Sequence, residues 1–186
     1  MWYQTFSIFY EKAAERMCQE CKEFIKKGSR ILDLGCGSGI VGNTFQNFFK
    51  AEVMGVDITD RRVLPIPFKT IDGKSLPFQD NNFDAVLISY VLHHSQDPML
   101  LLKEAKRVTR DKILVYEDLP DGIFSRLFCA LHGFLFDKLF QNKNRTSFKT
   151  EEEWKKVFAD LDLKMVFQKK VSFLNPVRKK LFVLQK

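Results

Sequence analysis

The sequence has few of the residues that would tie it to a metal, a disulfide framework or a membrane. It holds only four cysteines and three histidines among 186 residues. Cys18 and Cys21 form one C-x-x-C pair, but no second pair completes the four ligands of a structural zinc site, so we expect no metal. Both cysteines also fall on the apolar side of a helical pattern, which favours packing in the core. No apolar run has the length of a membrane span.

Secretory leader patterns, internal repeats and low-complexity tracts are also missing, and these absences favour a cytoplasmic location. Hydrophobic residues make up 45% of the chain and 19 residues are phenylalanine, which suits one packed domain. The net charge of +7 permits contact with nucleic acid or an anionic membrane surface. The basic residues are scattered, however, which is typical of a solvated surface.

The first two thirds of the chain alternate between strand-like and helix-like patterns. Such alternation predicts a parallel sheet of βαβ units with right-handed crossovers and helices on both faces. Ligands bind such sheets at the carboxyl ends of the strands. The expected strands are Arg30–Leu34, Glu52–Asp57, Phe68–Ile71, Phe83–Ser89 and Lys112–Tyr116, and the expected helices are Phe6–Lys27, Val41–Lys50 and Pro98–Val108.

The C-terminal part predicts one helix and an antiparallel pair of strands. Thr150 and Glu153 are spaced as a capping box, which would open a helix that runs through Leu161. The expected strands are Leu163–Phe173 and Lys180–Leu184, with a turn at Asn175-Pro176 between them. We expect this hairpin at the edge of the sheet.

The stretch ILDLGCGSGIVG, residues 31–42, follows a strand and precedes a helix, as a nucleotide-binding loop does. Gly35, Gly37 and Gly39 would let the backbone turn tightly and approach a ligand. The next strand ends in Asp57, whose carboxylate can accept both ribose hydroxyls. A nicotinamide dinucleotide explains these residues but not Asp33, because an acid there would repel a pyrophosphate. S-adenosylmethionine carries an amino group and no phosphate, so Asp33 and Asp57 suit its two ends.

Three further motifs favour S-adenosylmethionine: Ile71-Asp72-Gly73, the stretch DNNFDAVLIS at Asp80–Ser89, and YVLHHSQDP directly after it. Together with ILDLGCGSG they closely resemble the class I S-adenosylmethionine-dependent methyltransferases, in the small-molecule group of the quinone-biosynthesis C-methyltransferases. The resemblance covers about half of the chain, Gly28–Glu117. It implies a Rossmann-like α/β methyltransferase fold with a seven-stranded mixed sheet that ends in an antiparallel hairpin. One departure is Arg110-Asp111, which stand where the family usually has a Pro-Gly-Gly turn.

The resemblance also implies which residues hold the cofactor. The glycine loop would line the methionine part, the second strand would bind the ribose, and the third and fourth strands would supply the adenine and methionine contacts. By position these residues are Asp33, Gly35, Cys36, Gly37 and Gly39 in the loop, Asp57 on the ribose, Ile58, Asp72 and Gly73 around the adenine, and Ser89 and Tyr90 beside the methionine moiety.

Three residues are candidates for catalysis. His93 and His94 follow the fourth strand, and because a free histidine side chain titrates near neutrality, either would suit the removal of a proton from the methyl acceptor. Glu117 ends the fifth strand and could orient the acceptor or take its proton. Purely structural hydrogen bonds for the histidines, and helix capping or solvation for Glu117, stay open as alternatives.

The segment Gly122–Phe140 is apolar over more than half of its helical circumference, which is wider than a core-facing helix needs. It could cover an apolar or lipid-like acceptor, lie on a membrane surface, or pack on the sheet. We expect one methyltransferase domain over 1–186, divided into an N-terminal helix (1–27), a cofactor-binding core (28–117), a substrate lid (118–148), and a C-terminal helix with hairpin (149–186). An RNA or protein methyltransferase and a non-catalytic cofactor-binding module are the alternatives.

Overall fold

A computed structural model describes residues 7–139, 146–171 and 177–186. Its centre is a seven-stranded sheet in the order β3-β2-β1-β4-β5-β7-β6. The first five strands are parallel, and β7 runs antiparallel between β5 and β6. The strands are β1 (Arg30–Leu34), β2 (Glu52–Asp57), β3 (Phe68–Thr70), β4 (Phe83–Ser89), β5 (Thr109–Leu119), β6 (Lys164–Lys170) and β7 (Arg178–Gln185). The predicted mixed sheet with an antiparallel hairpin at its edge is therefore confirmed.

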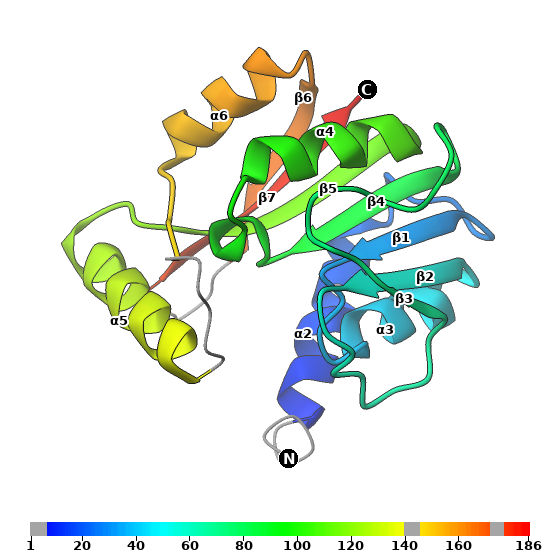
Figure 1. Cartoon of the computed structure of the whole chain (residues 1–186), viewed down its shortest axis with the longest axis horizontal. Helices are drawn as coiled ribbons and strands as arrows, with labels where there is room; N and C mark the ends of the chain where they lie inside the picture. Colours follow the sequence, from blue (N-terminus) through cyan, green and yellow to red (C-terminus); the bar gives the residue numbers. More distant parts are fainter. Residues whose placement is uncertain (1–6, 140–145, 172–176) are drawn as a thin grey trace.

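Helices cover both faces of the sheet (Figure 1). On one face α2 (Ser7–Cys21) and α3 (Ile40–Phe49) enclose a core that includes Met17 and Phe45. On the other face α4 (Pro98–Val108) and α6 (Glu151–Asp160) enclose a second core around Leu102 and Trp154. Cys18 and Cys21 are fully buried in the first core, as the helical pattern predicted.

Most element boundaries agree with the sequence, and the differences have local causes. The first helix ends at Cys21 and not at Lys27. In the turn that follows, the backbone N–H groups of Phe24 and Ile25 both donate to the Cys21 carbonyl, and Ile25 is buried in the core. Arg110 and Asp111, which stand in place of the family's Pro-Gly-Gly turn, lie within β5: this strand follows α4 at once, and Arg110 is ion-paired with Asp84 on β4.

The capping box before α6 is formed as expected, with Thr150 and Glu153 each accepting from the other's backbone N–H. Among the expected positions, Phe6, Phe140, Phe173 and the Asn175-Pro176 turn lie outside the described residues.

The helix α5 (Ile123–Leu139) covers neither face of the sheet. It stands beside the end of the molecule where the carboxyl ends of the parallel strands meet (Figure 1). Its buried residues are the small Ser125, Cys129 and Gly133, whereas eight of its large apolar side chains are exposed. No helix in the described part of the chain combines the length and apolar character needed to cross a membrane.

Candidate active site at the carboxyl ends of the strands

The glycine loop after β1 has a backbone that only glycine adopts comfortably. Gly35, Gly37 and Gly39 have φ angles of 77°, 49° and 75°, in the left-handed region. A Cβ at Gly35 would lie 2.4 Å from a methyl carbon of Val91, which follows β4, so a larger residue would collide. The loop therefore brings the ends of β1 and β4 into direct contact.

Asp33 lies beneath this loop and is almost fully buried. One of its carboxylate oxygens has no hydrogen-bond partner in the described structure, and a Cβ at Gly42 would lie 2.7 Å from that oxygen. Burial, with the nearby Asp57 charge as a second cause, raises the pKa of Asp33 to about 7. A cationic group that reached the loop would favour the charged form of this acid.

Asp57 joins the end of β2 to the glycine loop. Its Oδ2 accepts from the backbone N–H of Gly37 at 3.0 Å, and its Oδ1 accepts from the N–H of Ile58 at 2.7 Å. The carboxylate is only half-buried, so each oxygen keeps a lone pair for a ligand hydroxyl.

The residues expected around an adenine also meet. A Cβ at Gly73 would lie 3.4 Å from Ile58, whose side chain is 61% exposed and available to a ring. Asp72 is exposed, and its Oδ1 accepts from the N–H groups of Lys74 and Ser75. These bonds lower the pKa of Asp72 and leave its second oxygen for an amino group.

Cys36, Ser89 and Tyr90 have different surroundings. The Cys36 sulfur faces Gly55 on β2, and burial raises the pKa of the thiol, so Cys36 can contribute to a ligand site chiefly through its backbone. Ser89 is half-buried at the end of β4. Tyr90 has a φ of 59°, an unfavourable angle for a residue with a side chain, and its N–H donates to the Tyr116 carbonyl.

His93 and Glu117 form one buried pair. The short helix η1 (Leu92–His94) places His93 Nδ1 2.6 Å from Glu117 Oε2, and both side chains are fully buried. Glu117 Oε1 accepts from the N–H of Leu92 at 2.9 Å. Both carboxylate oxygens are thus engaged, so Glu117 orients His93. His93 Nε2 is buried and has no partner in the described structure.

His94 belongs to a second hydrogen-bonded chain. Its Nδ1 lies 3.1 Å from Thr146 Oγ1, and that oxygen lies 2.5 Å from Asp137 Oδ1. An ionised carboxylate can only accept, so the Thr146 hydroxyl donates to Asp137 and accepts the proton on His94 Nδ1. Burial and the neighbouring His93 lower the pKa of His94 to about 3, which keeps the ring neutral. Its Nε2 then carries a lone pair.

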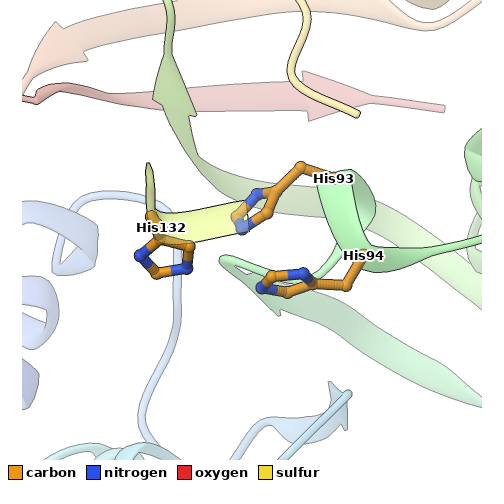
Figure 2. A group of neighbouring side chains, drawn as sticks. All are labelled: His93, His94 and His132. Carbon is orange, nitrogen blue, oxygen red and sulfur yellow. The ribbon is translucent and has the colours of Figure 1, made fainter. Parts of the chain in front are cut away.

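The third histidine of the chain joins these two. His132, on α5, has its ring centroid 5.9 Å from that of His93 and 5.7 Å from that of His94. Figure 2 shows the three rings pointing toward a common point between η1 and α5. One donor atom from each histidine lies within 4.8 Å of the others. The sequence motifs did not identify His132, Thr146 or Asp137 as part of this site. The one available sign was that His93, His94 and His132 are the only histidines of the chain.

Comparisons with known proteins fit this arrangement. Residues 32–115 match the family model described as a methyltransferase domain. An uncharacterized methyltransferase of Schizosaccharomyces pombe is 34% identical over 127 residues, covering 56% of this chain and 46% of the relative. A demethylmenaquinone methyltransferase of Staphylococcus aureus is 28% identical over 174 residues, covering 74% of this chain and 69% of the relative. The chain therefore spans between about half and about two thirds of the length of these relatives.

Solved structures give the same fold. A methyltransferase of Thermotoga maritima, described as a possible histamine N-methyltransferase, superposes with a TM-score of 0.70 at 20% identity over the whole of both chains. The fold, the glycine loop and the matched domain resemble those of the class I S-adenosylmethionine-dependent methyltransferases. Within that class the motifs resemble those of the quinone-biosynthesis C-methyltransferases, and the matched domain indicates S-adenosylmethionine as the cofactor, in agreement with the sequence prediction.

Proposed function

We propose that the chain transfers a methyl group from S-adenosylmethionine to a small apolar or lipid-like acceptor, with 1–186 acting as one methyltransferase domain. The cofactor supplies the electrophilic methyl group. The protein has to hold it, align the acceptor in line with it and keep water away. The same fold could instead serve an RNA or protein substrate, or a non-catalytic binding role, and the experiment below separates these.

In this proposal the cofactor lies across the carboxyl ends of β1, β2 and β4. The glycine loop approaches its methionine part, and Asp33 supplies negative charge near the amino group. Asp57 takes the ribose hydroxyls with its remaining lone pairs, and Ile58 and Asp72 flank the adenine. Support comes from the half-buried Asp57 carboxylate and from the proximity of Ile58 to Gly73.

The apolar acceptor is inferred chiefly from α5. Eight of its large hydrophobic side chains are exposed, among them Ile123 at 80%, Phe124 at 73% and Leu127 at 68%. Contiguous apolar surface of this kind marks a site for an apolar ligand, a membrane or a protein partner. Its position beside the carboxyl ends of the strands favours a wall of the acceptor site within the lid segment 118–148 (Figure 1). The relative named for demethylmenaquinone is in keeping with this substrate class.

The same face could rest on a membrane that holds such an acceptor. The net charge of +7 would assist a peripheral contact with anionic lipid. Of the two candidate bases, His93 is the better placed to remove a proton from an acceptor hydroxyl or carbon acid, because its Nε2 has no partner among the described residues. His94 is the weaker candidate, because its lowered pKa makes it a poor base near neutral pH. Glu117 acts through His93 and does not reach the acceptor.

A transfer assay tests the proposal. Purified protein would be incubated with methyl-labelled S-adenosylmethionine and a cell extract, which is then divided into lipid, RNA and protein fractions. We expect label in the lipid fraction, and loss of that label when Phe124 and Leu127 are both replaced by serine. Label confined to RNA or protein would contradict the acceptor class. S-adenosylhomocysteine binding without transfer into any fraction would contradict the enzymatic role.

A further inference from the structure

Three histidines gather between η1 and α5, although the sequence led us to expect no metal site. We propose that His93, His94 and His132 form a binding site for one divalent transition-metal ion of the zinc type. The proposal rests on their convergence and hydrogen bonding, and it does not depend on methyl transfer. A set of three imidazoles with an open fourth position is an established donor set for zinc.

His93 has a ring nitrogen that is available to a metal ion. His93 gives its Nδ1 proton to the Glu117 carboxylate, and this fixes the tautomer in which Nε2 carries the lone pair. That Nε2 is buried and without a partner in the described residues. A buried polar atom left unsatisfied costs free energy, and a bound cation would satisfy it.

Hydrogen-bond partners hold two of the histidine rings in place. Histidine ligands of metals commonly donate their other ring N–H to a carboxylate, a carbonyl or another fixed acceptor. His93 has Glu117 in this role, and His94 has Thr146, which is itself held by Asp137. The first chain comes from Glu117 on β5, and the second from Thr146 after α5 and Asp137 on α5, so the rings of His93 and His94 are fixed from behind.

The distances between the histidine nitrogens are close to those that a metal site requires. The donor atoms lie within 4.8 Å of one another, whereas donors at zinc–nitrogen distances of about 2.0–2.1 Å would lie roughly 3.4 Å apart. A rotation of the His132 side chain could bring its ring nitrogen closer to the nitrogens of the other two histidines. His132 is exposed on α5 and can turn, while the other two rings are held by their partners.

An ion at this point would connect α5 to the body of the protein. The buried residues of α5 are the small Ser125, Cys129 and Gly133, and the helix is held chiefly by hydrogen bonds of Ser125 and Asp137 and by the stacking of Phe136 on His94, so a metal bond through His132 would add a further attachment. With an ion bound, the donor nitrogens of the three histidines would be ligands and would not act as bases toward an acceptor.

The test is a zinc titration of the full chain after removal of metal with a chelator. We expect one high-affinity zinc per chain, at least a tenfold weaker affinity in His132→Ala, and greater resistance of α5 to proteolysis when zinc is bound. His132 is exposed, so this variant should fold even if replacement of the buried His93 does not. The matched control is Cys18→Ala with Cys21→Ala, which removes the C-x-x-C pair and should leave zinc affinity unchanged.

Two results would overturn the site. One is zinc affinity that His132→Ala leaves intact but the double cysteine variant removes. The other is the absence of stoichiometric zinc binding to the full chain. Cobalt gives a second readout, because a bound cobalt ion should absorb in the visible range in the wild type and lose that absorption in His132→Ala. An unchanged cobalt spectrum in that variant would also count against the site.

Discussion

Glu117 at the end of β5 and His93 on η1 are joined by a 2.6 Å hydrogen bond between Oε2 and Nδ1, with no solvent access to either side chain. The second oxygen of Glu117 accepts from the backbone N–H of Leu92, so one carboxylate fixes both the ring and the helix that carries it. This relationship links two neighbouring strand ends to the only cluster of histidines in the chain.

Replacing Glu117 by Gln should reverse the tautomer of His93. The amide NH₂ would donate to His93 Nδ1, the ring proton would move to Nε2, and the lone pair needed by a metal would be lost. We expect zinc affinity to fall by about 10- to 100-fold, the range for loss of such a supporting partner. Nitrogen chemical shifts of the imidazoles report the tautomer directly. The control is Glu104→Gln, which removes an acid paired with Arg107 elsewhere; equal losses in both variants would contradict the role of Glu117.

Asp57→Ala should weaken S-adenosylhomocysteine binding by about 100-fold, because two hydrogen bonds from ribose to a charged group contribute roughly 3 kcal/mol together. The alanine variant also removes the hydrogen bond to Gly37, so Asp57→Asn is a more specific test of the ribose contact. Asparagine keeps an acceptor for Gly37 and loses only the charge, and we expect it to bind between the wild type and the alanine variant. Calorimetric titration measures all three, and unchanged affinity in Asp57→Ala would refute the ribose contact.

Asp33 should make stability depend on pH. Its pKa is raised in the folded state to about 7, so folding binds a proton and the free energy of unfolding falls as pH rises toward 7. Asp33→Asn removes this dependence. Relative to wild type, the variant should gain about 2 kcal/mol between pH 5.5 and pH 8 in urea unfolding without ligand. A constant difference between the two proteins over that range would contradict the raised pKa.

Ligand binding should oppose this trend. An amino group near Asp33 favours its ionised form, so S-adenosylhomocysteine should bind wild type more tightly at pH 8 than at pH 6. Asp33→Asn should bind weakly at both values. Titrations at the two pH values measure this.

The orientation of α5 predicts an unusual pattern of substitutions. Changing the exposed Phe124 or Leu127 to serine should alter the free energy of unfolding by less than about 0.5 kcal/mol, since neither packs inside. Gly133→Val should cost about 1–3 kcal/mol, because even a Cβ there would lie 3.2–3.3 Å from Thr146 and Phe148. Urea unfolding measures both. Destabilisation by the serine variants and tolerance of valine would mean that α5 faces the other way.

Much of the sheet could be predicted because local signals coincide with it. Short apolar runs bounded by glycines or prolines mark β1, β2 and β4. The spacing of the loop glycines and Asp57 is enough to predict a nucleotide-binding site from the sequence. The histidine cluster could not be predicted, since His132 reaches it only through the tertiary placement of α5. Periodicity also does not show which side of α5 is buried, because its buried stripe consists of small residues while eight of its large apolar residues are exposed.

We expect the loop from Asp33 to Gly39 to hold S-adenosylmethionine and not a dinucleotide. The most direct test is parallel calorimetric titration of the full chain with S-adenosylhomocysteine and with NAD. We predict saturable binding of S-adenosylhomocysteine at one site per chain, weakened in Asp57→Ala, and no measurable binding of NAD. Tight binding of NAD with none of S-adenosylhomocysteine would contradict it.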